Sequence, residues 1–246
     1  MTKSRADLLL VARGLVDSRA KARATIEAGG VTADGKPVTK PSEMLHETCK
    51  LRAVMPHPYV GRGALKLLHA FELWPIEVDG AVVLDVGAST GGFTEICLER
   101  GAAKVYAVDV GRAQLHERLA ANPKVVSLEG VDARDLNTRL IPETPDLVVC
   151  DASFIGLAKV LPAALSLARP GADLIALVEP QFEVGPGRVG KGGLVKDPAD
   201  RARAVADVIS FLEGSGWPVL AHDDSPIAGG DGNLEFLLHA RKDRPD

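Results

Sequence analysis

The chain has 246 residues, 46% of them hydrophobic and 25% charged, and a formal net charge of −4, so it can bury a sizeable core. Residues 1–60 hold ten Lys and Arg against six Asp and Glu, a net charge of +4, whereas residues 61–246 carry a net charge of −8. This division indicates a small basic module suited to a polyanion and a larger, acidic, enzyme-like body.

Several kinds of protein are excluded by what the sequence lacks. Charges interrupt the short apolar run of the N-terminal MTKSRADLLL, and no window approaches the ~18 apolar residues of a membrane span. The three cysteines form no CxxC pair, and the six histidines are scattered without an i, i+4 pair, so we expect no disulfide framework and no metal cofactor. We expect a soluble cytoplasmic protein without a membrane partner, and a monomer, although no sequence feature determines the oligomeric state.

The first fifty residues predict two short helices followed by a hairpin. Leu8, Ala12 and Leu15 recur at helical spacing within residues 4–16. A second helix begins after a capping Asp17 or Ser18 and ends before two glycines. The segment VTADGKPV then places an Asp-Gly pair between β-branched residues, which is typical of a tight hairpin.

The second of these helices concentrates positive charge. Arg19 and Arg23 lie four positions apart with Lys21 close by, and like charges at this spacing are unfavourable unless a ligand neutralises them. A solvated helix face is the alternative. The segments SRADLLLVARGL, DSRAKARATIEAGGV and DGKPVTKPS resemble the S4 RNA-binding domain, which implies contact with the RNA backbone. The candidate RNA-binding residues are Lys3, Arg5, Arg19, Lys21, Arg23 and Arg62.

A change of pattern near residues 55–60 predicts a domain boundary. MPHPYV holds two prolines, and the residue before each is biased toward an extended conformation, as in a semi-rigid linker. We therefore expect one domain over residues 1–58 and another over residues 59–246. From residue 81 strands such as AVVLDV, AKVYAVDV, DLVVCD and DLIALVE alternate with helical segments, which predicts an α/β fold with a doubly wound, Rossmann-like parallel sheet.

The loop after AVVLDV points to a nucleotide ligand. It reads GASTGG, so glycines follow the strand that holds Asp85, and Ser89 stands where a dinucleotide fingerprint has its second glycine. A nicotinamide cofactor is thus disfavoured. Asp109 ends the next strand, where an acidic residue can accept hydrogen bonds from both hydroxyls of an adenosine ribose.

DVGASTGGFTE, together with VYAVDVG, resembles the S-adenosylmethionine site of FtsJ-type RNA methyltransferases. The resemblance implies that Asp85 and the loop hold the methionine end, and that Asp132 lies near the adenine, although Asp132 fits a solvent-facing turn equally well. The expected cofactor-binding residues are Asp85, Gly87, Ala88, Ser89, Gly91, Gly92, Phe93, Asp109, Val110, Asp132, Ala133 and Asp151.

Five further segments, YVGRGALKL, CDASFIGL, EPQFEVG, GKGGLVKDP and SPIAGGDGNLEF, resemble the TlyA family, also known as the hemolysin A family, over nearly the whole chain. The resemblance implies 2'-O-methylation of a ribose, that of a cytidine, in ribosomal RNA. A Lys-Asp-Lys-Glu set surrounds the methyl group in that family. Its first, second and fourth members correspond to Lys66, Asp151 and Glu235, whereas the third position holds Glu179.

The departure at Glu179 matters because a ribose hydroxyl reacts only when its proton is removed, and a lysine of near-neutral pKa could remove it. Three carboxylates around Lys66 should raise the pKa of that lysine and make it a poorer base. Weakened activity, rescue by Lys191 or Lys196, and Glu179 as an alternative base all stay open. The alternative function is a non-catalytic, ribosome-binding protein with a degenerate methyltransferase domain. A membrane-active protein is disfavoured because neither an apolar span nor a strongly amphipathic exposed helix is visible.

Overall fold

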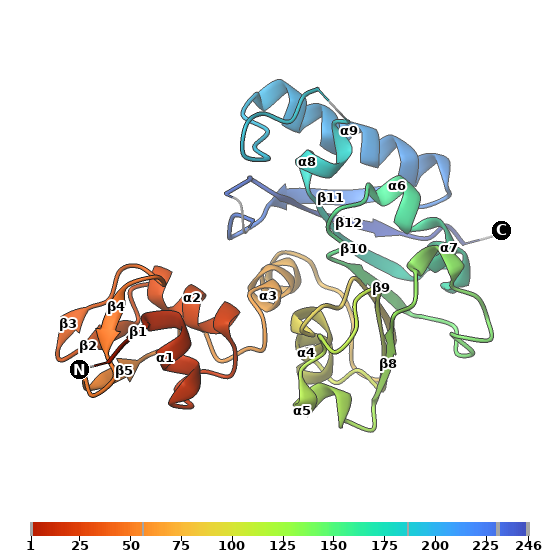
Figure 1. Ribbon diagram of the computed structural model, residues 1–246. Helices are drawn as coiled ribbons and strands as arrows, with labels where there is room; N and C mark the ends of the chain where they lie inside the picture. The colour runs from red at the N-terminus through yellow and green to blue at the C-terminus, as the bar shows by residue number, and fades with distance from the viewer. Residues whose placement is uncertain (1, 56, 186, 230–231, 245–246) are drawn as a thin grey trace. The chain divides into compact units, whose positions relative to one another are not determined.

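The computed structural model describes residues 2–55, 57–185, 187–229 and 232–244 (Figure 1). The chain divides into two compact units, Met1–Tyr59 and Val60–Asp246. Each unit has a hydrophobic core of its own. Within the part of the chain that is described, no helix has both the length and the apolar character needed to cross a membrane.

The first unit packs two helices with short strands. Its elements are β1 (Lys3–Arg5), α1 (Ala6–Ala12), α2 (Arg19–Glu27), β2 (Val31–Ala33), β3 (Lys36–Pro37), β4 (Met44–His46) and β5 (Leu51–Ala53). The strands form a three-stranded sheet in the order β3-β2-β5 and a separate β1-β4 pair, with every pairing antiparallel. β1, β4 and β5 were not predicted, because strands of three residues are too short to show a period.

Local sequence explains the turns of this unit. Ser18 caps α2 by accepting a hydrogen bond from the backbone N–H of Lys21. Asp34 and Gly35 both have positive φ angles, 49° and 79°, as the predicted tight hairpin requires.

The prediction of which residues of the first helix face the core was wrong. Leu8 and Leu15 are exposed, whereas Leu9 and Leu10 are buried in the core together with Ala6. The run of three leucines fits two helical faces equally well. The structure uses the face that also carries Ala6.

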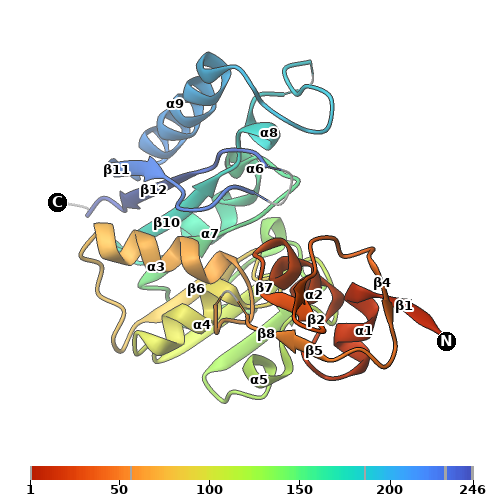
Figure 2. The same ribbon diagram turned by 90° about the vertical axis from the view of Figure 1, so that its left-hand side faces the viewer.

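The second unit is an α/β layer structure (Figures 1 and 2). Its strands are β6 (Val82–Val86), β7 (Lys104–Asp109), β8 (Val125–Glu129), β9 (Leu147–Cys150), β10 (Asp173–Val178), β11 (Val219–Asp224) and β12 (Phe236–Arg241). Its helices are α3 (Gly63–Leu73), α4 (Gly92–Glu99), α5 (Glu117–Ala120), the short 3₁₀ helix η1 (Ala133–Asp135), α6 (Leu157–Val160), α7 (Pro162–Leu167), α8 (Pro180–Glu183) and α9 (Pro198–Gly214).

The seven strands form one sheet in the order β11-β12-β10-β9-β6-β7-β8. The chain leaves β6 toward β7 and β8, then crosses back to β9 on the other side of β6, and these strands and β10 are parallel. The order therefore reverses between β6 and β9. In open α/β sheets a ligand binds at such a switch point, outside the carboxyl ends of the strands.

The sheet departs from an all-parallel arrangement at one edge. β12 runs antiparallel to both β10 and β11. β11 and β12 follow one another without a crossover helix, so they can only pair as antiparallel neighbours. This arrangement brings the segment before Phe236, which contains Glu235, beside the carboxyl end of β10.

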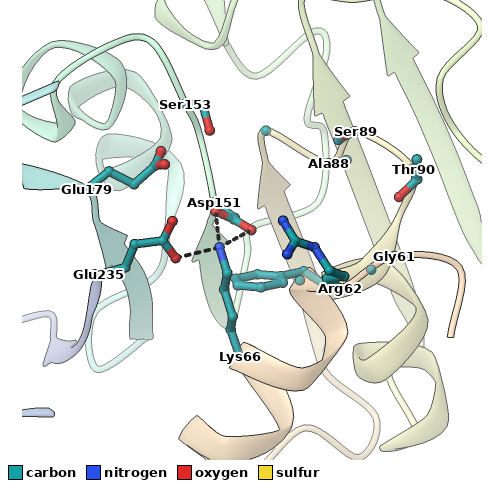
Figure 3. A pocket seen from close by; sticks show the side chains of 14 residues that line it. Gly61, Arg62, Lys66, Ala88, Ser89, Thr90, Asp151, Ser153, Glu179 and Glu235 are labelled. Atoms are coloured by element: carbon teal, nitrogen blue, oxygen red, sulfur yellow. Dashed lines mark hydrogen bonds and ion pairs between the residues drawn. The ribbon is translucent and has the colours of Figure 1, made fainter. Parts of the chain in front are cut away.

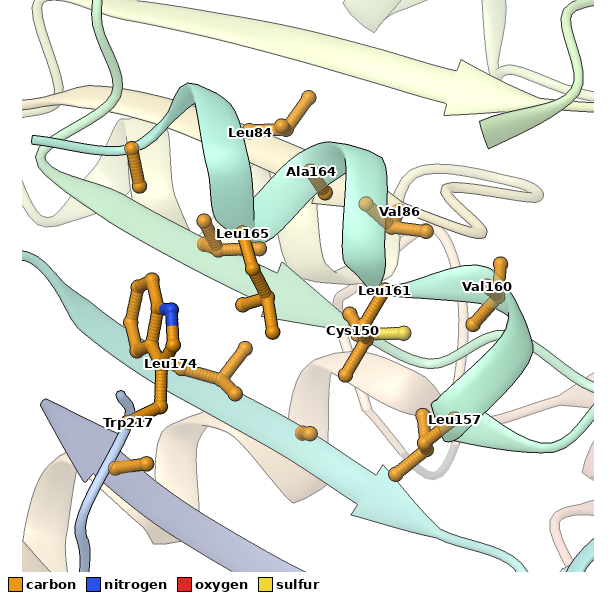
Figure 4. Close-up of a cluster of buried hydrophobic side chains, with 14 of the residues drawn as sticks. Leu84, Val86, Cys150, Leu157, Val160, Leu161, Ala164, Leu165, Leu174 and Trp217 are labelled. Atoms are coloured by element: carbon orange, nitrogen blue, oxygen red, sulfur yellow. The ribbon is translucent and has the colours of Figure 1, made fainter. Parts of the chain in front are cut away.

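Helices cover both faces of the sheet. On one face, leucines of α6 and α7 and of the turn between them pack against strand residues and the buried Trp217, and Figure 4 shows Leu157 of α6, Leu161 of the turn and Leu174 of β10 in this cluster. α3 and α4 lie side by side over the other face (Figure 2). The first turn of α9 is capped by Asp197, which accepts from the N–H of Ala199, with Pro198 at the first helical position as predicted.

Candidate active site

Two adjoining cavities open at the carboxyl ends of β6 and β9. The first, called here the Lys66 cavity, has a volume of about 270 Å³ and the second, the Asp109 cavity, about 420 Å³. Gly87, Ser89, Asp151 and Ser153 line both cavities. The sheet topology thus places a two-part site at the switch point, where a ligand can lie across both parts.

The loop between β6 and α4 gives the shared wall its shape. Gly87 has a φ of 82°, and a Cβ there would lie 2.7 Å from Cα of Ala152 in the neighbouring strand loop. Gly91 has a φ of 96° at the N-cap of α4, where a side chain would collide with Leu119. Side chains are disfavoured at both positions, and at Gly87 the backbone itself lines both cavities.

Asp109 ends β7 and lines the second cavity. Its carboxylate accepts hydrogen bonds from the backbone N–H of Ser89 (2.8 Å) and of Gly111 (2.7 Å). A carboxylate has about four acceptor sites, so two acceptor positions stay available for the two hydroxyls of a ribose. Asp132 lines the same cavity, with its carboxylate paired to Arg134. The glycine-shaped wall and these two carboxylates fit an adenosine-containing ligand.

Most of the expected cofactor-binding residues line the two cavities. They are Gly87, Ala88, Ser89, Gly92, Phe93, Asp109, Val110, Asp132, Ala133 and Asp151. Gly91 shapes the loop without lining either cavity. Asp85 is fully buried beneath the loop, where its Oδ2 accepts from the Thr94 hydroxyl at 2.6 Å. Burial raises the pKa of Asp85 to about 7, and the bond with Thr94 ties the end of β6 to α4.

A charged cluster occupies the Lys66 cavity (Figure 3). Lys66 extends from α3, and its Nζ lies 2.8 Å from Oε2 of Glu235 and 3.5 Å from both carboxylate oxygens of Asp151. Glu179, at the end of β10, lines the same cavity. Lys66 and Glu179 are each only 8% exposed, and Glu235 is 3% exposed, so the cluster is shielded from water.

Burial and charge set the protonation of this cluster. Burial alone would lower the pKa of Lys66, but Asp151, Glu235 and the more distant Glu179 outweigh it, and the pKa of the lysine is raised. This is the direction expected for a lysine facing three carboxylates. Burial raises the pKa of Glu235 and raises that of Glu179 to about 7. The cluster thus holds a firmly cationic lysine and a carboxylate that titrates near neutrality.

Neither proposed substitute for the missing lysine lies in the Lys66 cavity. Lys191 and Lys196 are exposed and line neither of the two cavities. Their loop is fastened by the buried Asn233, which accepts from the N–H of Val195 and donates to the carbonyl of Gly193. Rescue of the site by these lysines is therefore not supported.

The candidate RNA-binding residues fall in different surroundings. In the first unit Arg5, Arg19 and Arg23 line one cavity of about 470 Å³ together with the buried Asp7. Asp7 binds the guanidinium of Arg5 through both carboxylate oxygens at 2.9 Å and that of Arg19 at 3.0 Å. Lys3 is exposed on β1, and Lys21 pairs with Asp17 outside this cavity. Arg62 belongs to the second unit and lines the Lys66 cavity.

Sequence reasoning missed several residues that line the site. Ser153 and Phe154 lie in the segment CDASFIGL, of which only Asp151 was predicted to belong to the site. Phe154 is 89% exposed at the rim of the Asp109 cavity, with a φ of 69°, and contacts Phe182. Asp7 was not predicted to belong to a site, because it is one of several charged residues in and around the first helix. A partner for two arginines is visible only when the fold brings them together.

A switch-point site with a glycine loop, a carboxylate with acceptor positions available for a ribose and a buried lysine cluster is typical of a Rossmann-like methyltransferase. Comparison with known proteins agrees. The model of the FtsJ-like methyltransferase family matches residues 59–242, and that of the S4 domain matches residues 4–48. The chain therefore belongs to the FtsJ-like methyltransferase family, among members that carry an S4 domain.

Relatives narrow the group to the TlyA proteins. The chain is 47% identical to the 16S/23S rRNA (cytidine-2'-O)-methyltransferase TlyA of Mycobacterium tuberculosis, over 97% of this chain and 90% of that protein. It is 37% identical to hemolysin A of Brachyspira hyodysenteriae, over 96% and 98% of the two chains. A solved structure from Streptococcus thermophilus, described as a hemolysin, matches with a TM-score of 0.79 and 36% identity, over 99% and 90%. The family resemblance and the fold class predicted from the sequence are confirmed.

Proposed function

We propose that this protein transfers a methyl group from S-adenosylmethionine to the 2'-hydroxyl of a ribose in ribosomal RNA, and that the ribose is that of a cytidine. The buried cluster of Lys66, Asp151 and Glu235 carries the proposal, because it opens on a cavity adjoining the one that fits an adenosine. The similarity to the 16S/23S rRNA (cytidine-2'-O)-methyltransferase of Mycobacterium tuberculosis supports the choice of substrate.

The residues divide the work by position. Asp109 and the backbone of residues 87–90 would hold the nucleoside and methionine parts of the methyl donor, which supplies an electrophilic methyl group when bound. Lys66 keeps Asp151 and Glu235 oriented around the position of the reacting ribose. Holding the hydroxyl in line with the methyl group supplies much of the rate of such a transfer.

The two units fit separate tasks. We propose that residues 1–58 bind RNA through the cavity lined by Arg5, Arg19 and Arg23, and that residues 59–246 carry out the transfer. The division of the structure after Tyr59 and the spans of the two family models support this boundary. A monomer acting on ribosomal subunits in the cytoplasm is the simplest arrangement of such a protein.

The test is methyl transfer to ribosomal subunits purified from cells that lack this protein, followed by mass-spectrometric mapping of ribose methyl groups. We expect one or more 2'-O-methylcytidines with the native chain and a loss of product with Lys66→Ala. Equal product from both proteins would remove Lys66 from the mechanism.

The non-catalytic alternative draws its support from Glu179, which replaces a lysine of the family pattern. Calorimetry with S-adenosylmethionine separates the two functions in part. Binding without any ribose methylation would favour a ribosome-binding protein, and binding with methylation would exclude that reading.

A further inference from the structure

Glu179 presents a buried oxygen without a partner to the Lys66 cavity. Its Oε1 accepts from the Gln181 side chain at 3.2 Å, whereas its Oε2 has no hydrogen-bond partner among the described residues. The residue is 8% exposed and lines the cavity, and in Figure 3 it lies beside Glu235. A buried polar atom without a partner is unfavourable, so such an atom in a cavity indicates a group that is satisfied when a ligand arrives.

The surroundings of Glu179 leave it as the one carboxylate of the cluster without a close cation. Lys66 is committed to Glu235 at 2.8 Å and to Asp151 at 3.5 Å. Asp151 from the end of β9 and Glu235 from the segment before β12 repel a negative charge on Glu179, whereas the Ser153 hydroxyl and the more distant Lys66 favour the ionised form. Three carboxylates around one ammonium cannot all be ionised cheaply in a buried site.

We propose that Glu179 is the proton acceptor of the transfer, taking the proton of the ribose 2'-hydroxyl on Oε2 while Lys66 stays an ammonium throughout. This inference rests on the function proposed above. The O–H bond of the ribose breaks as its oxygen forms a bond to the methyl carbon, and the carbon–sulfur bond breaks with its electron pair on sulfur. The proton ends on Glu179, so atoms and charge balance without a further reactant.

Charge explains why a glutamate can serve where the family pattern has lysine. A sulfonium beside the cluster offsets one of the three negative charges and favours the ionised form of Glu179, which is the form that accepts a proton. When the donor has lost its methyl group, the positive charge is gone and a protonated Glu179 becomes the favoured form. The pKa of Glu179, about 7, suits a group that must both accept and release a proton near neutral pH.

The first experiment measures protons rather than product. Isothermal titration calorimetry at pH 7, in buffers of different ionisation enthalpy, gives the protons released when the methyl donor binds the full-length protein. With a pKa of about 7, Glu179 is about half protonated, so we expect release of up to about half a proton with S-adenosylmethionine and less with S-adenosylhomocysteine. Glu179→Gln should abolish the difference between the two ligands.

The control for charge is Glu72→Gln, because Glu72 is an exposed residue of α3 outside both cavities. It should release protons as the native chain does. Binding of S-adenosylhomocysteine to Glu179→Gln shows that this variant is folded. Proton release by Glu179→Gln equal to that of the native chain would overturn the proposal.

The second experiment follows the reaction. Glu179→Gln should lower the rate of ribose methylation by about 10²-fold or more and remove the rise of rate with pH between about pH 6 and 8. Glu179→Asp should keep the pH-dependent rise, at a lower rate. An active native chain with an equally active Glu179→Gln variant refutes the role of Glu179 alone, whereas a native chain that binds the donor but forms no ribose methyl refutes the proposed function as well.

Discussion

The two units each build a cluster of charged side chains, and the clusters have opposite designs. In the first unit Asp7 is buried between Arg5 and Arg19, whose side chains are 41% and 61% exposed. In the second unit Lys66 is buried among carboxylates that are themselves mostly buried. Cations outnumber the carboxylate in one cluster, and carboxylates outnumber the cation in the other.

The protonation of the two clusters differs accordingly. Hydrogen bonding from Arg5, and less strongly from Arg19, holds the pKa of Asp7 well below its usual range. Burial raises the pKa of Glu179 to about 7. The first cluster is therefore permanently charged, as a phosphate-binding surface requires, whereas the second can exchange a proton at neutral pH, as chemistry on a hydroxyl requires.

The largest effect is expected when the buried cation is removed. Lys66→Met should lower the free energy of unfolding at pH 8 by about 3–5 kcal/mol, because it leaves three carboxylates facing one another without a cation. The loss should shrink at pH 5, where protonation relieves the repulsion. Urea unfolding at both pH values measures the difference.

Lys104→Met is the matched control for that variant. Lys104 pairs with Glu143 at the surface, where the two side chains are 32% and 46% exposed. Loss of this pair should lower stability far less than loss of Lys66 at either pH, because exposed ion pairs contribute little. Equal losses for the two variants would show that the Lys66 cluster is as well solvated as a surface ion pair.

Asp7→Asn should produce the next largest change, a loss of about 1–3 kcal/mol at pH 7, because the guanidinium groups of Arg5 and Arg19 lose their buried acceptor. The folded pKa of Asp7 is below its unfolded value. Its contribution is thus fully present above about pH 4 and is lost as the pH falls through the folded pKa. Thermal unfolding of the native chain and the variant should therefore converge on acidification. A constant gap down to low pH would contradict the ion-pair origin of the effect.

Glu179→Gln should act in the opposite direction. The folded pKa of Glu179 is raised, so the folded state binds more protons than the unfolded state between about pH 4.5 and 7, and native stability falls as the pH rises through this window. The variant lacks this term and should be more stable than the native chain at pH 8, on the order of 1–2 kcal/mol. Urea unfolding of both proteins from pH 4 to 8 measures this difference in stability. A variant less stable than the native chain at pH 8 would show that Glu179 is well paired there.

The sequence predicted most successfully the sheet and the loop that surround the Lys66 cluster. The strand–glycine–helix pattern around residues 82–99 and the alternation of elements after it predict the sheet and the switch point, because each part has a local signature. The family pattern also brought together Lys66 of α3, Asp151 just after β9 and Glu235 just before β12. Their actual proximity depends on the sheet order, and no period or spacing carries that information.

Sequence reasoning was weakest where geometry alone decides. Asp85, expected at the methionine end of the cofactor, is fully buried beneath the loop and lines neither cavity, which no sequence pattern indicates. Lys191 and Lys196 follow Glu179 closely in the sequence, but they lie outside both cavities in the structure. Asp7 was overlooked because an aspartate flanked by polar and apolar residues has no distinctive signal until Arg19 of α2 is packed beside it.

The smallest effect, and the closest control for Asp7, is expected from Glu27→Gln. Glu27 pairs with Arg23 on the exposed face of α2, with side chains 53% and 70% exposed, so stability should change by less than about 0.5 kcal/mol. Both variants remove one negative charge from the first unit, and the general attraction of RNA should therefore increase equally. Only Asp7→Asn releases the two arginines from their fixed positions.

Affinity for a ribosomal RNA fragment, measured across a range of salt concentrations, separates these contributions. Each phosphate contact adds roughly 0.7–0.9 to the slope of log affinity against log salt. We expect Glu27→Gln to keep the native slope, because Arg5 and Arg19 still have Asp7 to position them. Asp7→Asn should lower the slope by the amount that corresponds to about one phosphate contact, even though this variant has the same net charge as Glu27→Gln. Identical slopes would mean that the carboxylate of Asp7 stabilises the fold without organising the proposed phosphate-binding surface. The contrast between a positioning cluster and a titrating one would then rest on the second unit alone.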